Sequence, residues 1–106
     1  MRPSVLVVEN HRDLSAQIVE ALERAEYACE SVRNGQAAIL KLREHEYGYI
    51  LIDDDEATDA GLLLARLEAE PATKKKLVVM SDFDQDDVAS LRKPFDSKAL
   101  LARLKP

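Results

Sequence analysis

The chain has 106 residues, 46% of them hydrophobic and 33% charged, which is enough for one hydrophobic core and too little for two. Its net charge of −5 and its short apolar runs argue against nucleic-acid binding, a membrane span and an export signal. We therefore expect residues 1–106 to form a single cytoplasmic domain. Lys74–Lys76, the only basic cluster, is interpreted as a solvated turn, and the single cysteine, Cys29, as a small buried strand residue.

Apolar runs and helical periodicity alternate along the chain. Strands are predicted at 4–8, 27–32, 49–52, 77–80 and 88–92. Helices are predicted at 12–25, 36–45, 61–70 and 96–104. Asn34-Gly35 predicts a turn, Pro71 the end of the third helix, and Asp96 the N-cap of the last. This alternation predicts an α/β fold with a parallel sheet that has helices on both faces.

Polar residues follow the predicted strands at the ends that would share the carboxyl edge of the sheet: Glu9, Asp53, Ser81 and Lys93. Ligands of such sheets bind at that edge. Carboxylates gathered there repel one another, at about 4 kcal/mol per pair at about 4 Å and an effective dielectric near 20, unless a cation joins them. Oxygen ligands in an incomplete cage favour Mg²⁺. Asp54 should point away from Asp53, because side chains alternate along a strand.

Five segments in order resemble the receiver domain of bacterial two-component response regulators, most of all the chemotaxis type: VLVVEN, NGQAAILKL, YGYILID with Gly61 eight residues after Asp53, VVMS, and KPFD. The resemblance covers nearly the whole chain. It implies a doubly wound, flavodoxin-like sheet of five parallel strands in the order 2-1-3-4-5. It also implies a signalling domain, not an enzyme, that takes a phosphoryl group from a histidine kinase or phosphotransfer protein with Mg²⁺.

The resemblance implies a role for each matching residue: Asp53 is the phosphoacceptor, Glu9 and Asn10 occupy the acidic pair, the Asp55 backbone carbonyl binds the metal, Ser81 is the switch hydroxyl, and Lys93 pairs with the phosphoryl group. These roles agree with the chemistry. A carboxylate attacks phosphorus, while Mg²⁺ and an ammonium group neutralise the phosphoryl oxygens.

The chain departs from the family pattern in three places. The second acidic position is Asn10, so Mg²⁺ should bind weakly; Asp54, Asp55 or Glu56 would compensate only in part. The position of the family's switch aromatic, three residues before Lys93, is Ser90. The short segment between Ser81 and Lys93 leaves no sequence for the family's fourth helix, so an extended loop is expected at 81–87. The sheet face without that helix is a candidate surface for a downstream partner.

Two other interpretations remain open. A pseudo-receiver, which binds proteins without being phosphorylated, is favoured by all three departures. A phosphatase of the haloacid dehalogenase type would also use an Asp-x-Asp pattern, here Asp53 and Asp55. Against it, this pattern follows the third strand instead of the first, Thr58 stands one residue too far along, and the chain is too short for a cap domain.

Overall fold

The computed structural model describes residues 2–54, 58–81, 89–92 and 95–104. Its strands are β1 (Ser4–Val8), β2 (Ala28–Val32), β3 (Tyr49–Asp53), β4 (Leu77–Ser81) and β5 (Ala89–Arg92). Its helices are α1 (Arg12–Arg24), α2 (Gly35–Glu44), α3 (Gly61–Glu68), α4 (Pro71–Lys74) and α5 (Ser97–Arg103). The strands and longer helices confirm the predicted alternation.

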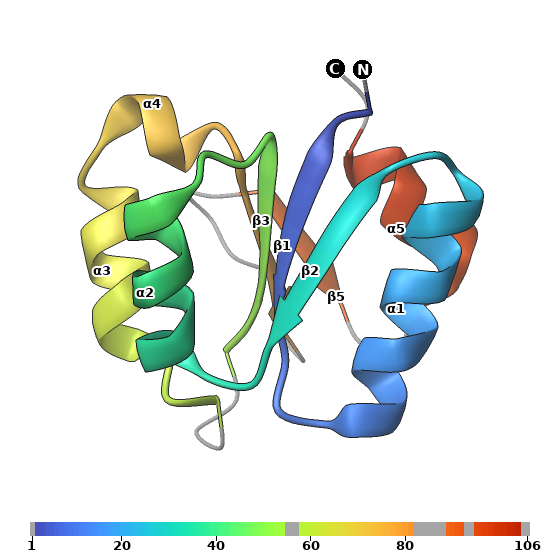
Figure 1. Ribbon diagram of the computed structural model, residues 1–106, viewed down its shortest axis with the longest axis horizontal. Helices are drawn as coiled ribbons and strands as arrows, with labels where there is room; N and C mark the ends of the chain where they lie inside the picture. Colours follow the sequence, from blue (N-terminus) through green and yellow to red (C-terminus); the bar gives the residue numbers. More distant parts are fainter. Residues whose placement is uncertain (1, 55–57, 82–88, 93–94, 105–106) are drawn as a thin grey trace.

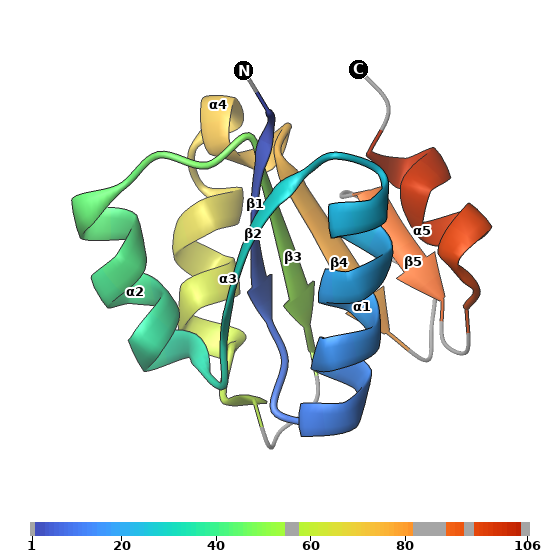
Figure 2. The same cartoon turned by 45° about the vertical axis from the view of Figure 1, so that its right-hand side comes forward.

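The strands form one parallel sheet in the order β2-β1-β3-β4-β5. This order confirms the doubly wound α/β fold. Helices α2, α3 and α4 lie on one side of the sheet, and α1 and α5 on the other (Figure 1; Figure 2). Strand order reverses between β1 and β3, and in such sheets a ligand crevice forms at the carboxyl ends of the two strands that flank this point.

Side chains alternate between the two faces of the sheet, and each face has its own core. On one face, Leu6 of β1 and Ile52 of β3 pack with Leu63 of α3. On the other, Val7 of β1 and Leu51 of β3 pack against α1 and α5. Burial on both faces explains why β1, β3 and β4 are continuous apolar runs in the sequence.

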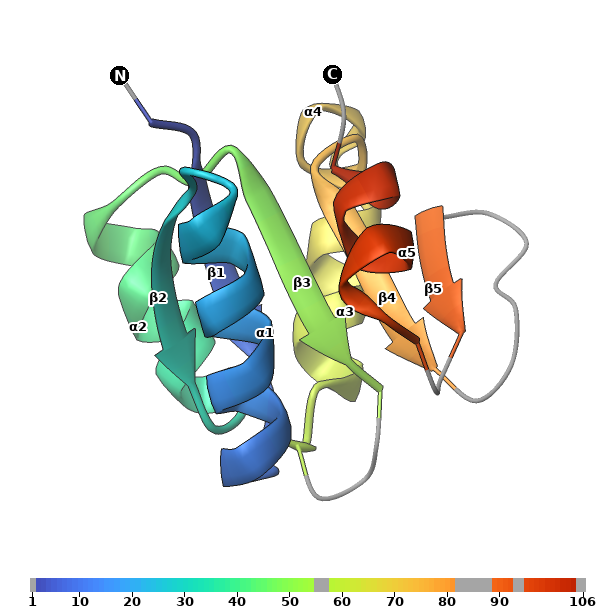
Figure 3. The ribbon, with the colours of Figure 1, turned by 90° about the vertical axis from the view of Figure 1, so that its right-hand side faces the viewer.

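Strand β5 lies at the edge of the sheet, with α5 beside it (Figure 3). Its parallel pairing with β4 runs from Val78 opposite Ala89 to Ser81 opposite Arg92. The chain thus returns from one end of β4 to the start of β5 within residues 82–88. The prediction of a loop at 81–87 was wrong at its first residue, because Ser81 ends β4. The other residues of this range lie outside the described part of the chain, so the loop stays a prediction there.

Three local predictions were wrong or incomplete. Asn34 begins α2 instead of forming a separate turn, because its side chain accepts a hydrogen bond from the amide of Ala37 at 2.9 Å. Pro71 does not only end α3; it also opens α4, where its missing amide hydrogen is tolerated. Cys29 lies in β2 as predicted but is only half-buried. Among the described residues, no helix combines the length and apolar composition that a membrane span needs.

Candidate functional site at the carboxyl edge of the sheet

Glu9, Asp53 and Ser81 meet at the carboxyl edge, on three neighbouring strands. Val8 pairs with Ile52, so Glu9 directly follows β1 beside Asp53 at the end of β3. Asp53 in turn pairs with Met80, the residue before Ser81. Adjacent parallel strands lie about 4.8 Å apart, so these three polar residues form one compact group.

All three side chains are buried: the exposed fractions are 2% for Glu9, 1% for Asp53 and 2% for Ser81. Asp54, the next residue along, is exposed. Alternation explains this difference. The side chain of Asp53 lies on the same face of the sheet as that of Leu51, whereas Asp54 is one residue further along and does not share that face. Two carboxyl groups buried on neighbouring strands are costly as a pair of anions unless neighbouring groups compensate their charge.

Hydrogen bonds that involve backbone amides fix Glu9. The amide of His11 donates to Oε2 of Glu9 at 3.2 Å, which ties the Glu9 side chain to the residue that precedes α1. The Glu9 amide donates to the carbonyl of Val32 at 3.0 Å, extending the β1–β2 ladder by one residue. The site is thus built on strand ends, where side-chain positions are most precise.

Thr58 is a member of this site that the sequence did not predict. Its side chain is fully buried, and its hydroxyl Oγ1 donates to Oδ2 of Asp53 at 3.3 Å. Thr58 belongs to the connection between β3 and α3. The sequence suggested only a poorly spaced phosphatase residue at this position, because nothing in its spacing shows that Thr58 lies against Asp53.

The structure describes the other predicted site residues only in part. Asn10 is half-buried beside Glu9, and Ser90 lies in β5 opposite Val79, although its side chain is not described. Asp55 and Lys93 fall outside the described residues. Within the described ranges, no group of three or more His, Cys, Asp or Glu side chains is arranged to hold a metal ion.

The donor types at the carboxyl edge nevertheless fit Mg²⁺. Glu9 and Asp53 supply two buried carboxyl groups, and Asn10 supplies an amide oxygen next to them. Hard oxygen donors of this kind suit Mg²⁺, which binds to one or two carboxylates and keeps several waters. The fourth predicted ligand is a backbone carbonyl, that of Asp55. Neither this carbonyl nor the Asn10 amide counts as an acidic, imidazole or thiol side chain, so these ligands would not register as a group of three or more such side chains.

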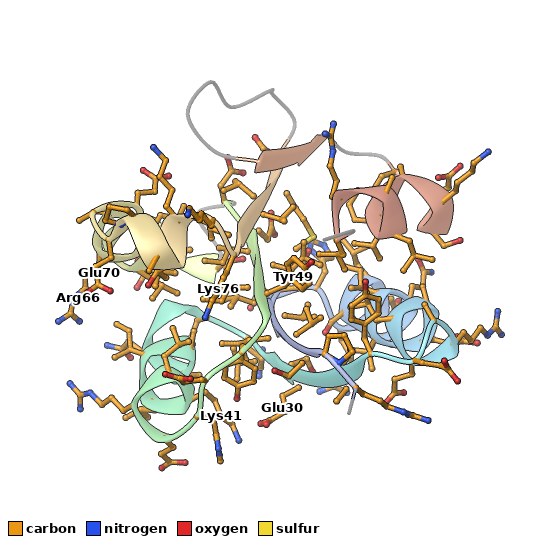
Figure 4. All side chains as sticks on the ribbon, turned by 90° about the horizontal axis from the view of Figure 1, so that it is seen from above. Glu30, Lys41, Tyr49, Arg66, Glu70 and Lys76 are labelled. Carbon is orange, nitrogen blue, oxygen red and sulfur yellow. The ribbon has the colours of Figure 1, made fainter. Side chains whose placement is uncertain are left out.

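Two of the surface grooves formed by the described residues are relevant to the site. One, of about 430 Å³, opens between α1 and β2 and includes Glu9 and Asn10 in its wall. The other, of about 410 Å³, lies between α2 and α3 towards the amino edge, where Figure 4 shows Arg66, Glu70 and Lys76. The first groove gives solvent a route to the acidic pair, and the second contains none of the predicted site residues.

A charge pair on β2 and α2 is separate from the site. Lys41 of α2 donates to Glu30 of β2 at 2.9 Å, and both side chains are labelled in Figure 4. This hydrogen bond holds the pKa of Glu30 below its ordinary value. Glu30 lies in the middle of β2, opposite Leu6, so the pair joins α2 to the sheet and takes no part at the carboxyl edge.

Comparisons with known proteins identify the fold. No protein-family model and no curated protein sequence matches the chain. The chemotaxis response regulator CheY4 of Vibrio cholerae superposes with a TM-score of 0.84 at 17% identity, over 98% of this chain and 97% of that one. A response regulator receiver domain from Methylobacillus flagellatus gives 0.80 at 23% identity, over 99% and 100%. An orphan response regulator of H. pylori gives 0.78 at 19% identity, over 99% and 100%. The chain therefore has the CheY-like fold of two-component receiver domains along nearly its whole length.

Proposed function

We propose that this chain is a phosphorylatable receiver domain in which Asp53 accepts a phosphoryl group from a histidine kinase or a phosphotransfer protein. The observation that best supports this proposal is the position of Asp53. It is buried at the end of β3, beside Glu9 of the neighbouring strand, at the edge where this fold presents its functional residues. The domain has no separate substrate. At most it promotes its own phosphorylation and dephosphorylation.

The chemistry needs only a positioned carboxylate and neutralisation of charge. An oxygen of Asp53 attacks phosphorus, and the bond from phosphorus to the donor breaks with its electron pair leaving on the donor. Glu9, Asp53, the Asp55 carbonyl and Asn10 would hold Mg²⁺, which when bound would neutralise the phosphoryl oxygens. Lys93 would pair with the same oxygens, and the Ser81 hydroxyl would contact the phosphorylated product.

A pseudo-receiver is the second candidate. Asn10 removes one charge from the acidic pair, and only seven residues join the parallel neighbours β4 and β5. Such a domain would bind a partner through the face around β5 without phosphorylation. The same face is our proposed surface for a downstream partner if the domain is phosphorylated.

Exposure to acetyl phosphate with Mg²⁺, read by intact mass, separates the two candidates. Wild type should gain the mass of one phosphoryl group, and Asp53→Asn should not. Asp54→Asn is the matched control, because it removes the exposed neighbouring carboxylate and should leave the modification intact. Amide NMR of each variant checks that the fold survives. An unmodified wild type that also shows no spectral change with beryllofluoride and Mg²⁺ would support the pseudo-receiver.

A further inference from the structure

We propose that Thr58 is a positioning residue that shifts Asp53 towards its unphosphorylated form and shortens the lifetime of the phosphorylated form. This inference rests on the proposed function, because it concerns how the same aspartate is regulated. It starts from a contact that no predicted role of the site residues uses: the Thr58 hydroxyl donates to Oδ2 of Asp53 at 3.3 Å, and both residues are buried.

The residues that follow Thr58 are held in place against α2 and α3. Asp59, the next residue, has a positive φ of 50° and lies with its backbone against Gly35 of α2. Ala60 is buried, and its carbonyl accepts from the amide of Leu64 at 2.8 Å in the first turn of α3. The hydroxyl is therefore anchored by packing on the α2 and α3 side of the sheet, and it does not depend on an exposed side chain for its position.

A hydroxyl in this position forms hydrogen bonds of different strength with the free and the phosphorylated Asp53. In the free state it donates to a carboxylate, and a hydrogen bond to an ionised acceptor is about twice as strong as one between neutral groups. In the phosphorylated state the same oxygen belongs to an acyl phosphate and carries much less negative charge. The Thr58 hydrogen bond therefore stabilises the free aspartate more than the phosphorylated one, and an equilibrium shifts towards the state that is bound more strongly.

The same contact acts on the rates. In hydrolysis, a water oxygen attacks phosphorus and the bond between Asp53 and phosphorus breaks. Its electron pair returns to the carboxylate, and the water gives its proton to solvent or to phosphate. Negative charge thus grows on the oxygens of Asp53, and a donor already aimed at Oδ2 stabilises that charge in the transition state. In phosphorylation, negative charge leaves the oxygens of Asp53. The Thr58 hydroxyl therefore stabilises the free aspartate more than the transition state, and it slows this reaction.

Thr58→Val tests this proposal, because valine has the shape of threonine without its donor. After acetyl phosphate is removed, the phosphorylated form of Thr58→Val should decay about three to ten times more slowly than wild type, since one hydrogen bond is lost from the transition state. The phosphorylated fraction at steady state should rise. Thr58→Ser restores a hydroxyl and should bring both quantities back towards wild type, which a role in packing alone would not predict.

Equal decay of wild type and Thr58→Val, or decay of Thr58→Ser that matches valine, would overturn the proposal. An unmodified wild type would instead count against the proposed function. A double-mutant cycle then tests the contact itself, using the unfolding midpoints of wild type, Asp53→Ala, Thr58→Val and the double variant. Thr58→Val should lower the midpoint less in the alanine background than in wild type. Equal shifts in both backgrounds would show that the hydroxyl and the carboxylate do not interact.

Discussion

Gly35 and Asp59 touch through their backbones: a Cβ on Gly35 would lie 2.6 Å from the carbonyl oxygen of Asp59. This contact joins the first turn of α2 to the connection that contains Thr58. Carbon and oxygen atoms without a bond between them do not approach so closely, so any side chain at position 35 must displace one of the two segments.

Gly35→Ala should therefore destabilise the domain, by about 1–3 kcal/mol, even though alanine favours a helix more than glycine does. Gly61→Ala is the matched control. Gly61 also begins a helix, α3, and its φ is not positive. Outside its own helix and chain neighbours, no atom of the described residues lies within 4 Å of its hypothetical Cβ. Gly61→Ala should be neutral or stabilising by up to about 1 kcal/mol. Urea unfolding of both variants measures the difference, and equal stabilities would show that the approach of Asp59 imposes no constraint.

Tyr27→Phe should lower stability by about 0.5–1.5 kcal/mol, since the Tyr27 hydroxyl donates to the carbonyl of Leu104 at 3.1 Å. This hydrogen bond links the residue before β2 to the residue after α5, so it joins distant parts of the chain. Chemical unfolding at neutral pH measures the loss. Unchanged stability would mean that water donates to the Leu104 carbonyl in place of the Tyr27 hydroxyl at no cost.

Stability should also fall as pH rises above about 10. Burial, and secondarily the charge of Tyr49, raises the pKa of Tyr27 in the folded state. The unfolded chain then loses its proton first, so the stabilisation is complete below the ordinary pKa of about 10 and declines above it. Tyr27→Phe should reduce this alkaline slope without abolishing it, because burial also raises the pKa of Tyr47. An identical slope in wild type and Tyr27→Phe would contradict the assignment.

Cys29 should react slowly with alkylating reagents. Burial, and then the charge of Glu23, raises the pKa of its thiol to about 11. Only the thiolate reacts, so at pH 8 the folded protein should be alkylated about a hundred times more slowly than the urea-unfolded chain. Mass spectrometry of timed iodoacetamide reactions measures both rates. Glu23→Gln should speed the reaction of the folded protein slightly, and equal rates for folded and unfolded wild type would refute the expected shift.

The strands could be predicted because their signals are local, whereas their order was implied by the resemblance to receiver domains. Val5–Val8 and Leu77–Met80 are buried on both faces and so are continuous apolar runs. Asp96 was correctly predicted as an N-cap, and its side chain accepts from the amide of Ala99 at 2.8 Å. Asn34 has the same role but was interpreted as a turn, because asparagine favours both structures and the following glycine resembles a hairpin signal.

The site was less predictable than the strands. Glu9, Asp53 and Ser81 each directly follow or end a buried strand, so parallel topology alone brings them to one edge. Thr58 has no such rule. Its contact with Asp53 depends on the path of the connection between β3 and α3, which the approach of Asp59 to Gly35 helps to fix. Contacts of this kind follow from tertiary packing, and no residue pattern in the chain encodes them.

Asn10→Asp should strengthen Mg²⁺ binding at least several-fold. Asn10 is half-buried next to the buried carboxyl of Glu9, so an aspartate there restores a negative charge beside the proposed cation. At a partly solvated site this added attraction is of the order of 1 kcal/mol, and about 1.4 kcal/mol corresponds to a tenfold change in affinity.

Gln17→Glu is the control for net charge, because Gln17 is exposed on α1. It adds the same charge away from Glu9 and should leave the affinity nearly unchanged. Amide NMR titration with Mg²⁺ measures all three proteins. If Asn10→Asp and Gln17→Glu both bind Mg²⁺ as wild type does, position 10 is not beside a metal, and the pseudo-receiver becomes the better account of this chain.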